Sequence, residues 1–238
     1  MYWIARMIQP VKQAGIGLLI LCLVAGVYVA RSDQAANAVP PSHPSVIFNG
    51  KDLSGWTQVP AHSWIVKNGA MTSLGVGRGM IYSAKNYSHY RLTFAARQIS
   101  GNHAACFLIF CTRPKPGKKP LDALAGIQFQ IPTGDHWDYR KGHNNSGRGE
   151  FHKLRHRKFN SHKWYRVDVR VNAAAGTARV YVAQPINSKP VEVAKFKNKA
   201  AGRVGPIAFQ MHNEKLFDQY KDVTIEEYPN SPARSQKP

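Results

Sequence analysis

The residues best suited to chemistry in this chain are polar side chains that alternate with apolar ones in two short segments. One segment reads Ile-Ala-Phe-Gln-Met-His and ends at His212, and the other reads Gly-Ile-Gln-Phe-Gln-Ile around Gln128. If both are strands, Gln210 and His212 share one face, as do Gln128 and Gln130. Imidazole readily accepts and returns a proton near neutral pH. His212 is therefore the first candidate for a catalytic base, and the glutamines are candidates to bind a polar substrate.

Further polar candidates lie elsewhere in the chain. Asn102 and His103 precede an apolar run, with His103 as a second candidate base and Asn102 as a substrate-binding group. Arg166 lies on the polar face of an alternating segment and is a further candidate to bind substrate. The polar segment 133–163 is longer than a compact domain usually tolerates as a loop. Such a loop is usually either functional or mobile.

This long polar segment contains groups able to hold a metal ion. His136, Asp138 and His143 can gather around a divalent cation, because imidazole and carboxylate are common metal ligands. Their spacing matches no standard metal template, so a solvated polar loop is the alternative interpretation. Trp137 and Tyr139 offer aromatic rings on which a sugar can stack.

Strands must position all of these residues, because no part of the chain outside its N-terminus sustains a helical period. Short runs rich in Val, Ile, Phe, Tyr and Thr recur, separated by Gly, Pro and Asn. Asn68-Gly69 between two such runs predicts a hairpin. About ten strands spaced in this way predict an all-β fold of two antiparallel sheets packed face to face.

The ends of the chain differ in composition from the middle. Arg6 and Lys12 precede an apolar run at 15–30, and an Ala-Asn-Ala triplet follows, which predicts a signal peptide or a membrane anchor helix. The domain is therefore expected outside the cytoplasm: periplasmic, on the cell surface or secreted. The predicted organisation is a signal or anchor at 1–38, a linker at 39–45, a folded domain at 46–228 and a disordered tail at 229–238.

The chain is strongly basic, with 33 Lys and Arg against 13 Asp and Glu and a formal charge of +20. This excess predicts attraction to anionic partners such as acidic polysaccharide. The basic run 152–159 is a candidate clamp for uronate, sulfate or phosphate groups, with a solvated surface as the alternative. Export disfavours nucleic acid as a partner, and membrane contact is expected only through the N-terminal segment.

Seven motifs follow one another between residues 47 and 228. They are IFNGKDLSGW, WIVKNGAM, GMIYSAKNYSHYRLTFAAR, GIQFQI, HKWYRVDVRV, GPIAFQMH and YKDVTIEEY. Their order and spacing resemble the 3-keto-disaccharide hydrolase family, also described as 3-keto-glucoside 1,2-lyases and 3-keto-2-hydroxyglucal hydratases. The resemblance implies a concanavalin-like jelly roll whose concave sheet faces a glycoside.

The implied reaction starts at a ketone on C3, which acidifies the C2 proton so that a base can remove it and the C1 substituent can leave. This chemistry needs one base and a group that stabilises an oxyanion. Gln128 stands where the family pattern usually has a carboxylate, and Asp135 or Asp138 can supply the missing charge. Three functions stay open: an exported enzyme acting on 3-keto-glycosides, a non-catalytic carbohydrate-binding module with a basic face for anionic glycans, and a basic surface protein without a sugar pocket.

Overall fold

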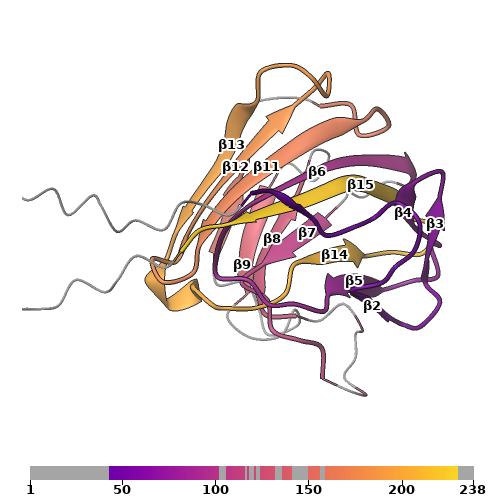
Figure 1. Ribbon diagram of the computed structural model, residues 1–238, viewed down its shortest axis with the longest axis horizontal. Helices are drawn as coiled ribbons and strands as arrows, with labels where there is room; N and C mark the ends of the chain where they lie inside the picture. The colour runs from indigo at the N-terminus through magenta and orange to yellow at the C-terminus, as the bar shows by residue number, and fades with distance from the viewer. Residues whose placement is uncertain are drawn as a thin grey trace, which may run out of the picture. The chain divides into compact units, whose positions relative to one another are not determined.

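The strands of this chain form two antiparallel sheets that pack face to face in the computed structural model (Figure 1). The structure describes residues 43–101, 106–115, 117, 121, 124–131, 136–140, 150–155 and 159–229. These residues belong to one compact unit, 38–238, and the predicted signal or anchor lies outside them. Fifteen strands and one 3₁₀ helix, η2 (Lys199–Ala201), occur in these ranges. No helix in the described ranges is long and apolar enough to cross a membrane.

The first sheet contains eight strands. Seven follow one another across the sheet, and β1 pairs with β15 beside them. In spatial order they are β13 (Val191–Lys197), β12 (Thr177–Ala183), β11 (Tyr165–Asn172), β6 (His89–Ser100), β15 (Phe217–Glu227), β4 (Ala70–Ser73) and β3 (Trp64–Lys67), with β1 (Ser45–Val46) on β15. We call it sheet A.

The second sheet contains seven strands and is called sheet B. In spatial order they are β10 (Glu150–Lys153), β9 (His136–Arg140), β8 (Gly126–Gln130), β7 (Cys106–Ile109), β14 (Ala208–Met211), β5 (Gly79–Ser83) and β2 (Trp56–Val59). Every strand pair in both sheets is antiparallel. The prediction of an all-β fold of two antiparallel sheets is confirmed.

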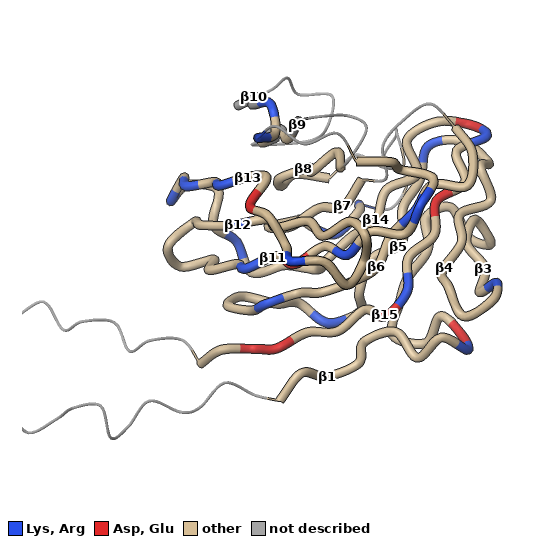
Figure 2. Tube along the Cα trace, turned by 90° about the horizontal axis from the view of Figure 1, so that it is seen from above, with Lys and Arg blue, Asp and Glu red and all other residues tan. Residues whose placement is uncertain are grey.

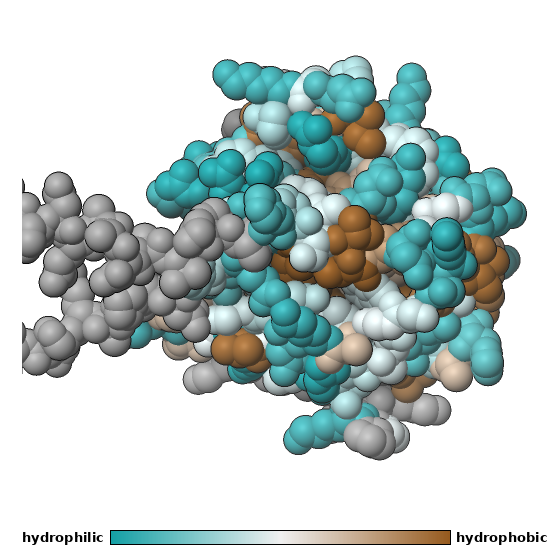
Figure 3. Space-filling view, viewed as in Figure 1, coloured by the Kyte–Doolittle hydropathy of each residue, from teal (hydrophilic) through white to brown (hydrophobic). Residues whose placement is uncertain are grey.

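Alternating side chains build the core between the sheets. In β11, Tyr165, Val167, Val169 and Val171 are buried, as the strict alternation of that segment predicts. Aromatic rings from both sheets meet at the centre, where Phe209 of sheet B stacks on Tyr220 of sheet A with ring centroids 4.0 Å apart. On the face shown in Figure 3, hydrophobic residues form separate patches between hydrophilic ones. Of the described large apolar side chains, most are buried.

Two turns near the start of the domain contain residues that adopt the positive φ angles these turns require. Asn68 and Gly69 have φ of 52° and 73°, the two positive values that a tight hairpin turn between β3 and β4 requires, so the predicted hairpin is confirmed. Before it, Gly55 has φ 82° and leads into Trp56, whose Nε1 donates a hydrogen bond to Ile47 O at 2.7 Å. Trp56 covers the core and stacks on Phe209.

The segment predicted as one long loop, 133–163, contains two strands. β9 and β10 pair with each other at the edge of sheet B, with Trp137 opposite His152. The alternation of His, Trp, Asp, Tyr and Arg in β9 is a period-two signal. Just after β10, Arg155 N donates to Val193 O of β13 at 2.7 Å, which joins the two sheets along one side.

Candidate functional site

The predicted glutamines meet on the outer face of sheet B, turned away from the core. Register places Gln130, Cys106 and Gln210 opposite one another on β8, β7 and β14. Gln128 lies two residues before Gln130, and its Nε2 donates to Gln210 Oε1 at 2.9 Å across β7. Residues 82 positions apart in the chain are therefore in direct contact. We call this surface the glutamine face.

The glutamine face is buried rather than open. Gln128, Gln130 and Gln210 are 2%, 7% and 0% exposed. They share the face with a second apolar cluster, separate from the core, that contains Met80, Cys106, Leu108, Cys111, Leu124 and Ala208. This burial contradicts the prediction that these three glutamines contact a polar substrate directly. The two amides are held by their mutual hydrogen bond in a mostly apolar layer, where an unpaired amide would be costly.

Substitution of Gln128 tests the strength of this buried pair. We expect Gln128→Ala to lower the free energy of unfolding by about 1–3 kcal/mol, because Gln210 Oε1 loses the hydrogen bond that it accepts in a buried site. Gln128→Met keeps the side-chain volume and removes only the amide. Urea denaturation of both variants separates the two contributions, and a Gln128→Met protein as stable as wild type would contradict a role for the hydrogen bond.

His212 lies at the accessible rim of the glutamine face. It directly follows β14, is half-buried, and is two residues beyond Gln210, so strand alternation puts both on the same face. The pairing of β14 with β5 continues to a bridge between Val76 and Glu214, and this register sets His212 opposite Arg78. A base and a guanidinium therefore occupy neighbouring positions at the end of two paired strands.

Sequence reasoning missed Arg78. It precedes β5, in a glycine-rich stretch where no strand pattern is evident, and it is half-buried. The alternation of Arg78, Met80 and Tyr82 was the available signal, because Met80 faces the glutamine layer and Arg78 shares its parity. A fixed cation in this position is suited to stabilise a developing oxyanion.

The two aromatic candidates lie in the core. Trp137 and Tyr139 are 5% and 6% exposed, and their ring centroids lie 5.2 and 6.0 Å from that of Phe196 of sheet A. Both rings therefore face the space between the sheets. This placement contradicts the prediction that they stack on a sugar, because both side chains are almost completely buried.

Arg166 also lies away from the glutamine face. It belongs to β11 of sheet A, and its Nη2 donates to Ser188 O at 3.4 Å. Its neighbours Tyr165 and Val167 are buried, so Arg166 points outward from the opposite side of the sandwich. The structure therefore separates the candidate Arg166 from the glutamines, because alternation assigns a face of a strand but not the sheet to which that strand belongs.

The remaining candidates concern the metal site and the second base. Asn102, His103 and His143 lie outside the described residues. The backbone of β9 sets His136 opposite Gln130 and Asp138 opposite Gln128. Among the residues that the structure describes, no three His, Cys, Asp or Glu side chains gather as metal ligands. The metal site stays a prediction, and metal analysis of Asp138→Ala protein tests it.

One carboxyl group lies inside the sandwich, where no candidate was expected. Asp218 of β15 is 0% exposed, and its Oδ1 accepts a hydrogen bond from Gln98 Nε2 at 3.1 Å. Its Oδ2 has no hydrogen-bond partner in the described part of the chain. Burial raises the pKa of Asp218 to about 7. Since it faces the core between the sheets, we assign it to stability rather than to the site.

Fold and site together define the class of this protein. Two face-packed antiparallel sheets form a lectin-like jelly roll, and the family match makes it one of the carbohydrate-active type. More narrowly, the chain belongs to the family of 3-keto-alpha-glucoside-1,2-lyase-like domains, whose model matches residues 43–226. The resemblance noted in the sequence is confirmed. No curated protein matches the chain in sequence.

Solved structures share the fold at low identity. A Parabacteroides distasonis protein provisionally assigned as a glycosyl hydrolase is 14% identical, with a TM-score of 0.53 over 77% of this chain and 98% of its own. The exoplasmic domain of VIP36, solved with Ca²⁺ and Man3GlcNAc, is 9% identical with a TM-score of 0.55 over 81% and 93%. The carbohydrate-binding module CBM66 of Bacillus subtilis is 13% identical, with a TM-score of 0.50 over 74% and 97%. These likenesses concern the fold.

Proposed function

We propose that this protein is an exported enzyme that acts on 3-keto-glycosides by removing the C2 proton and eliminating the C1 substituent. The observation that carries the proposal is the placement of His212 opposite Arg78 at the rim of the glutamine face, in a member of a 3-keto-glucoside lyase-like family. The family supplies the substrate class, and the two residues supply a base and a cation.

The chemistry assigns one role to each residue. The C3 ketone makes the C2 proton acidic, and His212 accepts that proton. The electron pair of the C2–H bond then forms an enolate, and Arg78 stabilises the negative charge on the enolate oxygen. The enolate then expels the C1 oxygen, which takes a proton from the imidazolium of His212, and a C1–C2 double bond remains. Addition of water to this double bond yields the free 3-keto sugar.

The glutamine face supports this rim from behind. Its buried amides and apolar side chains pack around β14, the strand that His212 directly follows. We propose that this packing positions the histidine. Asp138 on the neighbouring strand pairs in register with Gln128, and we propose that it supplies the charge that Gln128 does not. A divalent ion bound by residues of β9 would further polarise the ketone.

A non-catalytic carbohydrate-binding module is the second candidate. The observation that favours it is Gln128, a neutral amide where the family pattern usually has a carboxylate, buried and paired with Gln210. An amide pair of this kind can preserve the fold without taking part in proton transfer. In this case the protein binds the sugar and leaves it unchanged.

An assay with p-nitrophenyl 3-keto-glucoside distinguishes the two functions. We expect purified protein to release p-nitrophenol faster than the spontaneous elimination, to react more slowly with substrate deuterated at C2, and to leave the matching glucoside that lacks the ketone intact. The same assay with a chelator shows whether a metal is required. Sugar binding by calorimetry without release above the spontaneous rate would overturn the catalytic proposal and favour the binding module.

A further inference from the structure

The outer face of sheet A carries four cations in one row across four adjacent strands. Register pairs Arg91 of β6 with Arg170 of β11, Arg170 with Arg179 of β12, and Arg179 with Lys195 of β13. We call these four residues the cationic row. Strands lie about 4.8 Å apart, so the row spans roughly 14 Å. Figure 2 shows basic positions recurring along β11, β12 and β13.

Such a row lowers the stability of the folded protein, because like charges directly opposite one another on a sheet repel. Acidic neighbours compensate one end of it. Arg91 Nη2 and Nε donate to Asp168 Oδ2 at 2.6 and 3.0 Å, and Arg91 lies 3.9 Å from Glu226. Arg170 lies 3.8 Å from Asp168, and its side chain stays 58% exposed. The charge of Arg91 is therefore matched locally, and that of Arg170 only weakly.

Compensation is weaker toward β13. Glu192 is shared between Arg179 at 3.4 Å and Arg155 at 3.3 Å. Within the part of the chain that the structure describes, neither Lys195 nor Lys197 forms an ion pair. Positive charge thus accumulates at one end of the row, which fits binding of an external anion.

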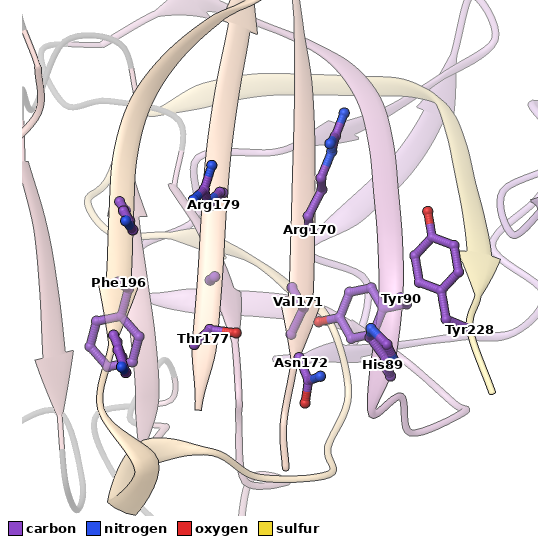
Figure 4. Close-up of a pocket in the computed structure, with 12 residues that line it drawn as sticks. His89, Tyr90, Arg170, Val171, Asn172, Thr177, Arg179, Phe196 and Tyr228 are labelled. Atoms are coloured by element: carbon purple, nitrogen blue, oxygen red, sulfur yellow. The ribbon is translucent and has the colours of Figure 1, made fainter. Parts of the chain in front are cut away.

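A groove of about 490 Å³ lies along the row, from His89 of β6 to Lys195 and Lys197 of β13 (Figure 4). Among the residues that the structure describes, its outward-facing lining includes Arg170, Arg179, Lys195 and Lys197 and no acidic residue. A second hollow of about 340 Å³ on the other side of β13 shares Lys195 and Lys197 and adds Lys153 and Arg155. The cationic surface therefore continues around the edge of sheet A, long enough for a polymer.

The uncharged lining indicates the kind of anion. Asn172 and Thr177 are cross-strand partners and offer amide and hydroxyl groups suited to sugar hydroxyls. Tyr228 packs against His89 with ring centroids 5.2 Å apart, at the β6 side of the groove (Figure 4). Guanidinium groups bind carboxylate and sulfate in a bidentate manner. The exposed large apolar residues Val46, Ile65, Val76, Ile99 and Val204 do not line the groove, which disfavours a lipid surface.

We infer that this groove is a second site, which binds an acidic polysaccharide through its uronate or sulfate groups. The choice of a glycan over a nucleic acid rests on membership of a carbohydrate-active family. The groove lies on sheet A and the glutamine face on sheet B, so the two sites are on opposite sides of the sandwich. The protein can therefore stay attached to an acidic polymer while the rim at His212 remains open.

Binding of the full chain to polygalacturonate at two salt concentrations tests this site. The double variant Arg170→Gln/Arg179→Gln should bind at least tenfold more weakly than wild type. Wild-type binding should weaken steeply between 50 and 300 mM salt, because the Debye length falls from about 14 to about 6 Å and exposed charges are screened. The control Lys51→Gln/Lys67→Gln removes the same charge from exposed positions outside the groove and should change affinity less than twofold.

Stability and turnover measurements separate a loss of polymer binding from misfolding or loss of catalysis. Melting temperature should change little in Arg170→Gln/Arg179→Gln, because the loss of two ion pairs of exposed arginines, to Asp168 and Glu192, is offset by the removal of like-charge repulsion. If that variant does unfold, Lys195→Gln/Lys197→Gln replaces it. Turnover of a small 3-keto-glucoside should be unchanged, so loss of polymer binding is distinguishable from loss of catalysis. Equal weakening by the control pair, or tighter groove-dependent binding of a single-stranded oligonucleotide, would overturn the inference.

Discussion

Replacing His212 by glutamine is expected to lower kcat/KM on a 3-keto-glucoside by about 100-fold or more. General-base catalysis typically contributes a factor of about 10² to 10⁴, and an amide cannot accept the C2 proton. Because the amide still hydrogen-bonds, substrate binding should change little, so the loss should appear in kcat rather than in KM. Steady-state kinetics at saturating and low substrate concentrations measure the two separately.

A matched control excludes a general effect of losing a histidine. His43 is exposed and precedes β1, which pairs with β15 of sheet A and not with the strands of the His212 rim, so His43→Gln should retain wild-type kinetics. Arg78→Gln should also slow the reaction, since the enolate oxygen loses its cation. A folded His212→Gln protein with kcat within threefold of wild type would show that another residue removes the proton, and His103 would become the next candidate.

Asp218→Asn is expected to stabilise the protein at pH 8 by about 2–4 kcal/mol and to flatten its pH dependence. An unfolded aspartate ionises near pH 4, whereas burial raises the pKa of Asp218 to about 7 in the folded protein. Between these values the folded state holds a proton that the unfolded state has lost. The stability of the wild type therefore includes a contribution that is complete below about pH 4 and is lost as the pH rises through 7. Asparagine cannot ionise and has no such loss.

Urea denaturation of both proteins from pH 4 to pH 8 measures this difference. Asp222→Asn provides the control on the same strand, because Asp222 is exposed and asparagine tolerates its positive φ of 53°. We expect that control to follow the wild type within about 0.5 kcal/mol at each pH. An Asp218→Asn curve parallel to the wild-type curve would mean that Asp218 stays ionised in the folded state.

Alternation in the sequence predicted the faces of the strands but not their neighbours. Gln128, Gln130 and Gln210 could be assigned to polar faces because apolar residues flank each of them. Their hydrogen bond depends on β7 lying between β8 and β14, an order that no local pattern encodes. Their burial depends on apolar residues from other strands, such as Met80.

The errors have similar causes. Arg166 has the expected parity on its own strand, but its strand belongs to the other sheet. Trp137 was assigned to a loop, although the alternation within β9 places its ring in the core. Asp218 follows an irregularity between Phe217 and Asp218 in the pairing of β15 with β6, and an irregularity of this kind changes which residues face inward. Such changes are set by the paired strand and are not evident in one segment.

The hydrogen bond from Arg155 to Val193 has a consequence for how the protein behaves at high concentration. Free strand edges invite pairing with another molecule and so promote aggregation. At the β13 edge, the backbone carbonyl of Val193 already accepts a hydrogen bond from Arg155 N. Lys195 and Lys197 on the same strand add positive charge that repels a second copy. The opposite edge of sheet A is β3, where Ile65 is 41% exposed. Of the two edges of sheet A, β3 is therefore the one from which fibre-like self-assembly should begin.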